Sequence, residues 1–200
     1  MLMILSDMRI MQEMEKGTIK IDPYDPACLG SNSYDLHLWV VLSCYNDDVI
    51  DAKKDNPVTE FLIPEEWIVL HPWKLYLWAT LEYTETLAHV PFLEGKSSTW
   101  RLGIDIHATA WKWDVGFRWY WTLEISVAIP VRVYAGMPIG QMIYFPVEWD
   151  IKTSYDQKSN AKYSDQIARP VWSKMRMNTF PTEKIAEQLR TQRDQFENNA

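Results

Sequence analysis

From Ser33 to Phe145 the chain is a succession of short apolar runs separated by turn residues, with no stretch of helical periodicity between them. Short runs at this spacing are typical of antiparallel strands, whereas a parallel α/β sheet needs helices between its strands. The region therefore predicts an all-β sandwich, jelly roll or barrel. The predicted strands are Tyr34–Leu42, Phe61–Ile63, Trp67–Leu70, Lys74–Glu82, Ile104–Thr109, Thr122–Ile129, Val131–Tyr134 and Gln141–Phe145.

The N-terminal segment predicts a helix followed by a strand. Ser6 and Asp7 are suitable caps for a short helix over Met8–Lys16, and Gly17 is placed to end it. Thr18–Asp22 then alternates between apolar and polar residues as a short strand does.

The C-terminal part of the chain is polar. Residues 152–169 read as a solvated loop, whereas 181–200 predict a helix that Thr182 caps and that carries apolar residues on one face (Ile185, Leu189 and Phe196). We expect this helix to lie on the body of the protein, with a role in oligomer contacts as the alternative. The sequence thus predicts one domain over 1–180 and a helical tail over 181–200.

Composition narrows the class of partner. No apolar run approaches the ~20 residues that span a bilayer, and the N-terminus lacks the features of a signal peptide, so we expect no membrane association. A net charge of −7 argues against a nucleic-acid partner, although a few clustered cations can still bind a small anion. Two cysteines, Cys28 and Cys44, do not make a disulfide framework, which indicates reduced thiols in the cytoplasm.

One carboxylate interrupts the most regular strand pattern. The odd-numbered positions from 121 to 129 are all apolar. A strand would therefore place Glu124 on the opposite face, beside Thr122 and Ser126. The pattern alone favours a solvated glutamate; the functional alternative is a carboxylate, partly shielded from water, that shuttles a proton.

The predicted strand Ile104–Thr109 places Asp105, His107 and Thr109 on one face. A lone histidine on a strand is more often a hydrogen-bonded structural residue than a base or a metal ligand. The four histidines are not at metal-ligand spacings, and the H-x-E and P-C-x-x-C signature is absent. These observations argue against a zinc deaminase.

A compact cluster of hydrogen-bond donors precedes that strand. Gly95–Ser98, followed by Arg101, offers backbone amides, two hydroxyls and two cations, which together can hold phosphate oxygens. Walker A, GxGxxG and GxSxG sequences are all absent. The cluster therefore predicts an anion site without assigning it to a known nucleotide-binding motif.

These elements together resemble the dCTP deaminase branch of the dUTPase-like trimeric superfamily. The pattern G-[RK]-S-S-x-x-R-L-G-x-x-x-H-x-T-A-x-x-x-D-x-G-[FW] aligns without a gap to Gly95–Phe117, and L-E-[IF] follows at Leu123–Ile125. A Y-x6-K-x3-Q arrangement matches Tyr155, Lys162 and Gln166 in the tail. The resemblance covers the chain up to Phe180. It implies an all-β dominated, distorted jelly-roll (β-clip) dUTPase-like fold with a short N-terminal helix and a C-terminal helix.

The resemblance implies hydrolytic deamination of dCTP to dUTP and ammonia without a catalytic zinc. Glu124 would be the general base and then the acid, Arg101 and Ser97 would orient it, and the backbone around Ala110 and Ala108 would position base and water. The residues implied in binding the substrate are Lys96, Ser98, Ala108, Thr109, Asp114, Tyr155, Lys162 and Gln166, with Mg²⁺ carried by the triphosphate rather than by protein side chains.

The implied partners are dCTP, two further copies of the chain in a homotrimer whose pockets lie between subunits, and a thymidine nucleotide as a feedback ligand. Two alternatives stay open. One is a bifunctional deaminase and dUTPase that gives dUMP, and the other is an inactive nucleotide-binding or assembly protein on the same scaffold.

Tryptophan stands where the family pattern has glycine. The chain has 7 Gly and 11 Trp; Trp39, Trp73, Trp100 and Trp111 fall at usual glycine positions, and a second set resembles them (Trp67, Trp78, Trp113, Trp119 and Trp149). A gene that uses UGA for glycine, translated with UGA as tryptophan, would give this pattern. Deliberate engineering and a lineage that tolerates tryptophan are the alternatives, and UGG codons at Trp73, Trp100 and Trp111 would rule out the first explanation.

Overall fold

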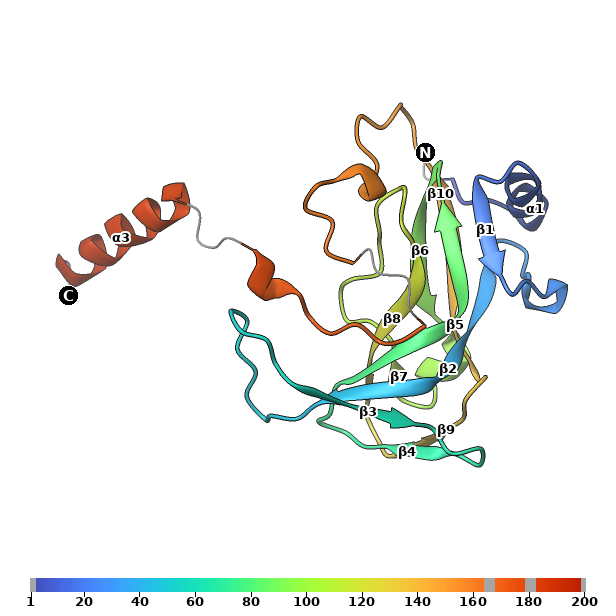
Figure 1. The fold of residues 1–200 in the computed structure, drawn as a ribbon, viewed down its shortest axis with the longest axis horizontal. Coiled ribbons are helices and arrows are strands. Elements are labelled where there is room, and N and C mark those ends of the chain that lie inside the picture. The colour runs from blue at the N-terminus through green and yellow to red at the C-terminus, as the bar shows by residue number, and fades with distance from the viewer. Residues whose placement is uncertain (1–2, 164–167, 179–182, 199–200) are drawn as a thin grey trace.

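The computed structural model describes residues 3–163, 168–178 and 183–198, with side chains of the last segment described at 183, 185–192. β-Strands are the main regular structure in the described chain (Figure 1). The strands are β1 Ile19–Asp22, β2 Tyr34–Tyr45, β3 Val58–Leu62, β4 Ile68–Leu70, β5 Tyr76–Thr86, β6 His89–Gly95, β7 Ile104–Asp105, β8 Arg118–Val127, β9 Val131–Val133 and β10 Pro138–Pro146.

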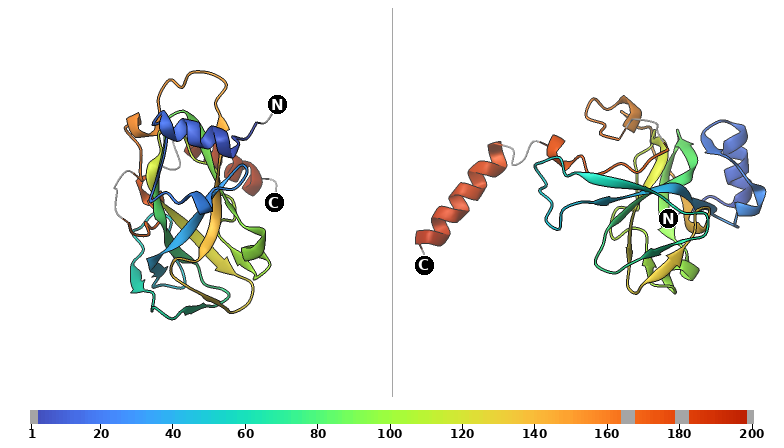
Figure 2. Two further views of the ribbon diagram at one scale, coloured as in Figure 1. Left: turned by 90° about the vertical axis from the view of Figure 1, so that its right-hand side faces the viewer. Right: turned by 60° about the horizontal axis from the view of Figure 1, so that its bottom comes forward.

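Eight of these strands form one strongly curved antiparallel sheet. Its hydrogen-bonded order is β6-β10-β2-β5-β8-β7, with β1 added to β5 and β3 added to β2, while β4 and β9 pair separately. Two further views show how the sheet curls around its own apolar face (Figure 2). The core inside this curve includes Leu36, Trp78, Leu93, Trp121 and Leu123, all fully buried. The predicted all-β class is therefore confirmed.

The predicted N-terminal helix is confirmed, and it begins one residue earlier than predicted. α1 spans Asp7–Glu15, and the Ser6 hydroxyl accepts a hydrogen bond from the Arg9 N–H at 3.4 Å. Gly17 follows with φ of +73°, the left-handed conformation that ends helices and that glycine adopts without strain.

The other helical elements are short except at the C-terminus. They are η1 Pro26–Cys28, α2 Ser97–Trp100, η2 Tyr155–Gln157, η3 Met175–Met177 and α3 Glu183–Asn198. α3 confirms the predicted C-terminal helix, although its predicted cap, Thr182, lies outside the described residues. The expectation that this helix lies on the body was wrong, because α3 stands apart from the sheet (Figure 1).

The strand predictions were wrong in two places. Residues 104–109 do not form one strand: β7 ends at Asp105, and Thr109 is exposed whereas His107 is buried, so the two do not share a face. β6 was not predicted. It contains Pro91, a residue that lacks a backbone donor and weakens a strand pattern, yet Pro91 pairs with Tyr144 of β10.

The structure separates the tryptophans into two groups. Trp78 and Trp119 are buried, and the Trp78 indole N–H donates to the Trp39 carbonyl at 2.7 Å, as expected of tryptophans that belong in a core. Trp73 is fully exposed and has φ of +67°, the one positive φ outside glycine in the described part of the chain. Its backbone is therefore that of a glycine turn after Pro72.

We expect Trp73→Gly to stabilise the protein by about 0.5–1 kcal/mol, because relief of left-handed strain exceeds the entropy that glycine adds to the unfolded chain. Urea denaturation measures this change. Trp149→Gly is the matched control: Trp149 is also exposed but has no positive φ, so its replacement should give no gain. Equal effects of the two changes would contradict the prediction.

The hydrogen bonds of the Glu13 carboxylate lead us to expect that it contributes to stability in a pH-dependent way. This buried carboxylate accepts hydrogen bonds from Lys16 Nζ at 2.8 Å and from Thr18 Oγ1 at 2.5 Å. These donors lower the pKa of Glu13 from 4.5 to about 2. A carboxyl whose pKa is lower in the folded state stabilises the fold above its unfolded pKa, and this stabilisation is lost as the pH falls through the folded pKa.

Glu13→Gln should therefore lower the free energy of unfolding by up to about 3 kcal/mol near neutral pH, and by progressively less as the pH falls from about 4.5 toward 2. Urea denaturation of both proteins near neutral pH and at about pH 3 checks this. A difference that stays constant over that range would show that the lost contact is not electrostatic.

Candidate active site

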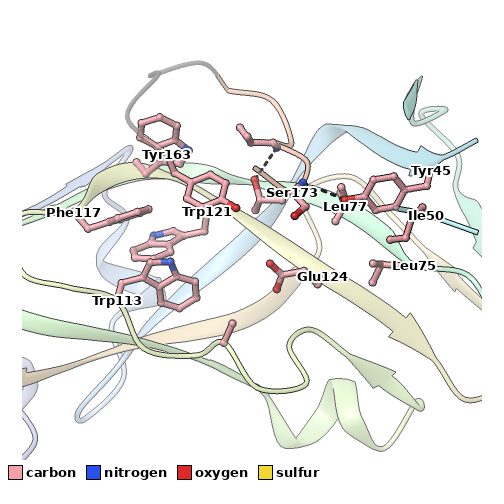
Figure 3. A pocket seen from close by; sticks show the side chains of 14 residues that line it. Tyr45, Ile50, Leu75, Leu77, Trp113, Phe117, Trp121, Glu124, Tyr163 and Ser173 are labelled. Atoms are coloured by element: carbon pink, nitrogen blue, oxygen red, sulfur yellow. Dashed lines mark hydrogen bonds between the residues drawn. The ribbon is translucent and has the colours of Figure 1, made fainter. Parts of the chain in front are cut away.

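Glu124 faces a cavity because β8 alternates strictly. From Trp119 to Val127 the odd-numbered side chains are buried, while the even-numbered ones are half-buried or exposed. The Glu124 side chain is 41% exposed and lines a cavity of about 410 Å³, called here the Glu124 cavity. Figure 3 shows its carboxylate pointing into this space, with Trp113 on one side and Leu75 on the other.

The segment after β7 brings His107 to this carboxylate. Asp105 pairs with Ser126 at the end of β8, and the Glu124 N–H donates to the Ile106 carbonyl at 3.1 Å. The next residue, His107, then contacts Glu124 Oε2 through Nδ1, with its own side chain 2% exposed. The sequence predicted only a hydrogen-bonded structural histidine here and did not identify its partner.

Aromatic rings form one wall of the Glu124 cavity. Trp113 meets Trp121 edge-on with 4.4 Å between ring centroids, and Phe117 stacks on Trp121 at 4.6 Å. Such apolar walls with a few convergent polar groups are typical of small-molecule sites and suit a planar ring.

The C-terminal segment closes another side of this cavity (Figure 3). The Val171 N–H donates to Thr122 Oγ1 at 3.0 Å, and the Ser173 N–H donates to the Tyr45 hydroxyl at 3.1 Å. Tyr163 from the same segment also lines the cavity. The tail is thus in contact with the face of β8 that carries Glu124.

A second cavity, of about 400 Å³, adjoins the first and carries positive charge. Its walls include three lysines together with Asp114 and Tyr155, and it is called here the lysine cavity (Lys112, Lys158 and Lys162). Trp113, Phe117 and Tyr163 line both cavities, so the two spaces share a wall. The structure therefore brings together three of the residues predicted to bind substrate, Asp114, Tyr155 and Lys162, and their role in binding stays a prediction.

Ion pairs order the lysine cavity. Lys158 Nζ donates to Asp114 Oδ2 at 2.5 Å, and Lys112 Nζ lies 3.6 Å from Asp114 Oδ1. The hydrogen bond from Lys158, with burial opposing it, lowers the pKa of Asp114 below its ordinary value. Asp114 is therefore ionised at neutral pH. The third lysine, Lys162, donates a hydrogen bond to the Asn178 side-chain oxygen.

Gly116 allows the tail to approach this cavity. Its φ is +87°, and a Cβ there would lie 2.6 Å from Asp156 Oδ1 and 2.8 Å from Ser154 Cβ. The Tyr155 N–H donates to the Val115 carbonyl at 2.8 Å across this contact. Only a residue without a side chain permits that approach, which sets Tyr155 in the lysine cavity.

The donor cluster lies elsewhere. It surrounds α2, where Ser97, Ser98 and Arg101 are exposed and Lys96 forms an ion pair with Asp35. None of these residues lines the Glu124 cavity, and across the described ranges no ion pair involves Arg101. One chain therefore does not bring Arg101 and Ser97 to Glu124, and their predicted role there stays a prediction.

The remaining predicted residues fall into two cases, and two lysines were missed. Ala110 lines the Glu124 cavity, while the neighbouring Ala108 and Thr109 are exposed and do not line it. Gln166 lies outside the described residues. Lys112 and Lys158 were not predicted; the signal available was their position, beside Asp114 within the motif and three residues after Tyr155.

No group of three or more His, Cys, Asp or Glu side chains suited to a metal ion occurs in the portion that the structure describes. In the same portion, no helix combines the length and apolar character needed to cross a membrane. Cys28 and Cys44 are free thiols.

Comparison with known proteins is consistent with this arrangement. A family model described as dCTP deaminase-like matches residues 4–147. A protein from Clostridium acetobutylicum named dCTP deaminase, dUMP-forming, is 47% identical over 163 residues, which are 82% of this chain and 91% of that protein. A protein of the same name from Leptospira biflexa is 45% identical over 168 residues, 84% of this chain and 94% of its own.

The fold also matches a solved structure, the 2'-deoxycytidine 5'-triphosphate deaminase from Agrobacterium tumefaciens. The TM-score is 0.59 at 20% identity over 73% of this chain, which spans only 49% of that longer chain. This likeness confirms the predicted fold class. The family model matches most of the sequence, and the alignment with the Clostridium protein covers nearly the whole length of that protein. The chain therefore belongs to the dCTP deaminase-like family.

Proposed function

We propose that the protein hydrolyses dCTP to dUMP, ammonia and diphosphate in the cytoplasm. The observation that carries this proposal is the Glu124 cavity beside the lysine cavity, in a chain 47% identical to a relative named dCTP deaminase, dUMP-forming. The motifs alone predicted dUTP as the product. The names of the relatives favour the dUMP-forming alternative instead.

In the deamination, Glu124 takes a proton from a water whose oxygen attacks C4 of the pyrimidine. It then delivers that proton to the exocyclic nitrogen, while the proton of the hydroxyl left on C4 passes to ring N3. Ammonia leaves as the C4–N bond breaks and the C4=O bond forms. Trp113 and Trp121 offer the pyrimidine an apolar wall. The backbone at Ala110, which lines the Glu124 cavity, positions the base and the water.

The triphosphate occupies the lysine cavity in this proposal. Lys112, Lys158 and Lys162 supply positive charge there, and Tyr155 supplies a hydroxyl. A second water attacks the α-phosphorus and breaks its bond to the oxygen that bridges to the β-phosphorus. Diphosphate leaves, and dUMP remains.

We propose that Mg²⁺ enters the lysine cavity with the triphosphate, bound by phosphate oxygens and waters rather than by protein side chains. Asp114, the carboxylate in that cavity, is already paired with Lys158 and Lys112, which leaves the phosphate oxygens as ligands for the ion. When bound, the ion would neutralise phosphate charge. A thymidine nucleotide that competes for the same cavities stays our proposal for the feedback ligand.

We further propose that a second copy of the chain completes the site within a homotrimer. Ser97, Ser98 and Arg101 are exposed on α2, away from the Glu124 cavity of their own chain. In a cyclic trimer each copy can present this cluster to the cavity of its neighbour. Arg101 and Ser97 would then orient Glu124, and Ser98 and Lys96 would reach the phosphates.

Glu124→Gln should reduce ammonia release from dCTP by at least about 100-fold, because the amide cannot accept and return the proton. Glu65→Gln is the matched control, since Glu65 is exposed in the loop between β3 and β4 and should leave the rate unchanged. Ammonia, diphosphate and nucleotide products are measured in parallel.

The products separate the alternatives. Equal amounts of ammonia and diphosphate with dUMP support the full proposal. Steady-state dUTP without diphosphate would refute the dUMP-forming step alone. An absence of ammonia from the wild-type protein would refute the deaminase assignment and favour an inactive nucleotide-binding protein. Wild-type turnover by Glu124→Gln would instead refute the role of Glu124 as the base.

A further inference from the structure

We infer that His107 is a positioning residue for Glu124: its Nδ1–H donates to the Glu124 carboxylate and holds it toward the substrate space. The inference rests on the proposed function, because it concerns the geometry of the proposed base. It assigns a role to a side chain that the mechanism above does not use.

Hydrogen bonds other than the contact between the two side chains hold the backbone of both residues in place. The Glu124 N–H donates to the Ile106 carbonyl at 3.1 Å, and the His107 N–H donates to Asp105 Oδ1 at 3.2 Å. Asp105 is itself paired with Ser126 in the sheet. The two side chains therefore project from neighbouring segments that are hydrogen-bonded to each other.

The His107 ring is buried with one hydrogen-bond partner. Its side chain is 2% exposed, and Trp113 packs against it with 5.3 Å between ring centroids. The Nε2 atom is buried and has no partner within the described residues. Within the described residues, Glu124 is thus the hydrogen-bond partner of the His107 side chain, and the bond is made through Nδ1.

This geometry also assigns the tautomer of His107. An ionised carboxylate only accepts hydrogen bonds, so the proton of a neutral imidazole must sit on Nδ1 to make this contact. Nε2 is then a bare acceptor, whose burial leaves no N–H unpaired. The contact therefore makes His107 a fixed donor to Glu124 through Nδ1.

Glu124 needs such a donor because its own surroundings do not fix it. Its side chain is 41% exposed, and across the described residues no other side chain donates a hydrogen bond to it. A long, half-exposed carboxylate samples several rotamers, and misplacing a catalytic group by about 1 Å can cost roughly 100-fold in rate. His107 selects the rotamer that points into the cavity.

The test compares three replacements in the full-length protein with dCTP as substrate. His107→Leu removes the donor and should lower kcat about 100-fold with KM changed by less than about threefold. His107→Asn places an amide N–H near the Nδ1 position and should recover at least about 10-fold of that loss. His107→Gln places its amide nearer Nε2 and should recover less.

Two controls separate positioning from folding. His89→Leu and His89→Asn change another buried histidine with an unpaired ring nitrogen, on β6 and away from Glu124, so kcat should stay within about threefold. Thermal melts show which variants fold. If His107→Leu does not fold, the comparison of Asn with Gln decides, because both are polar and only Asn matches the Nδ1 geometry.

The outcomes distinguish this inference from the proposed function. An active wild type whose His107→Leu variant keeps kcat within about threefold, or whose Asn and Gln variants are equal, would overturn the role of His107 alone. A wild type that releases no ammonia from dCTP would overturn the proposed function, and this inference with it.

Discussion

The antiparallel pairing of β8 with β5 determines which side chains form the core and where Glu124 lies. In this register Trp78 lies opposite Leu123 and Tyr76 opposite Ile125, so the apolar side chains of both strands enter the core together. Because side chains alternate with a period of two, a slip of one residue would bury Glu124 and expose its apolar neighbours. The packing energy of the core thereby places the carboxylate in its cavity.

The two cavities follow from how other segments meet this strand. The loop after β7 supplies His107 on one side, and the loop before β8 supplies Trp113 and Asp114 on the other. Gly116 allows the C-terminal segment to pack closely against this loop, which places Lys158 beside Asp114. Further along the same segment, Val171 packs over Thr122 and donates a hydrogen bond to it. An acidic chain can thus concentrate positive charge locally, next to an apolar wall and one carboxylate.

Local patterns predicted what depends on local sequence. The alternation around Glu124 and the cap at Ser6 identified β8 and α1, because periodicity and capping act over a few residues. Neither the contact of His107 with Glu124 nor the meeting of Lys158 with Asp114 could be predicted this way, since each joins segments brought together only by the fold. The prediction of where α3 lies was also wrong, because an amphipathic pattern shows that one face of a helix is apolar but does not show what packs against that face.

If Glu124 of one copy acts with Arg101 of another, as we propose, mixed trimers will regain activity that each variant lacks. Glu124→Gln and Arg101→Gln, each inactive alone, are co-expressed with different tags and purified together. A site shared between copies predicts that the mixed trimers regain about a third of wild-type dCTP turnover, because each of them has one intact site of its three. Mixed trimers that stay as inactive as the single variants would contradict the account.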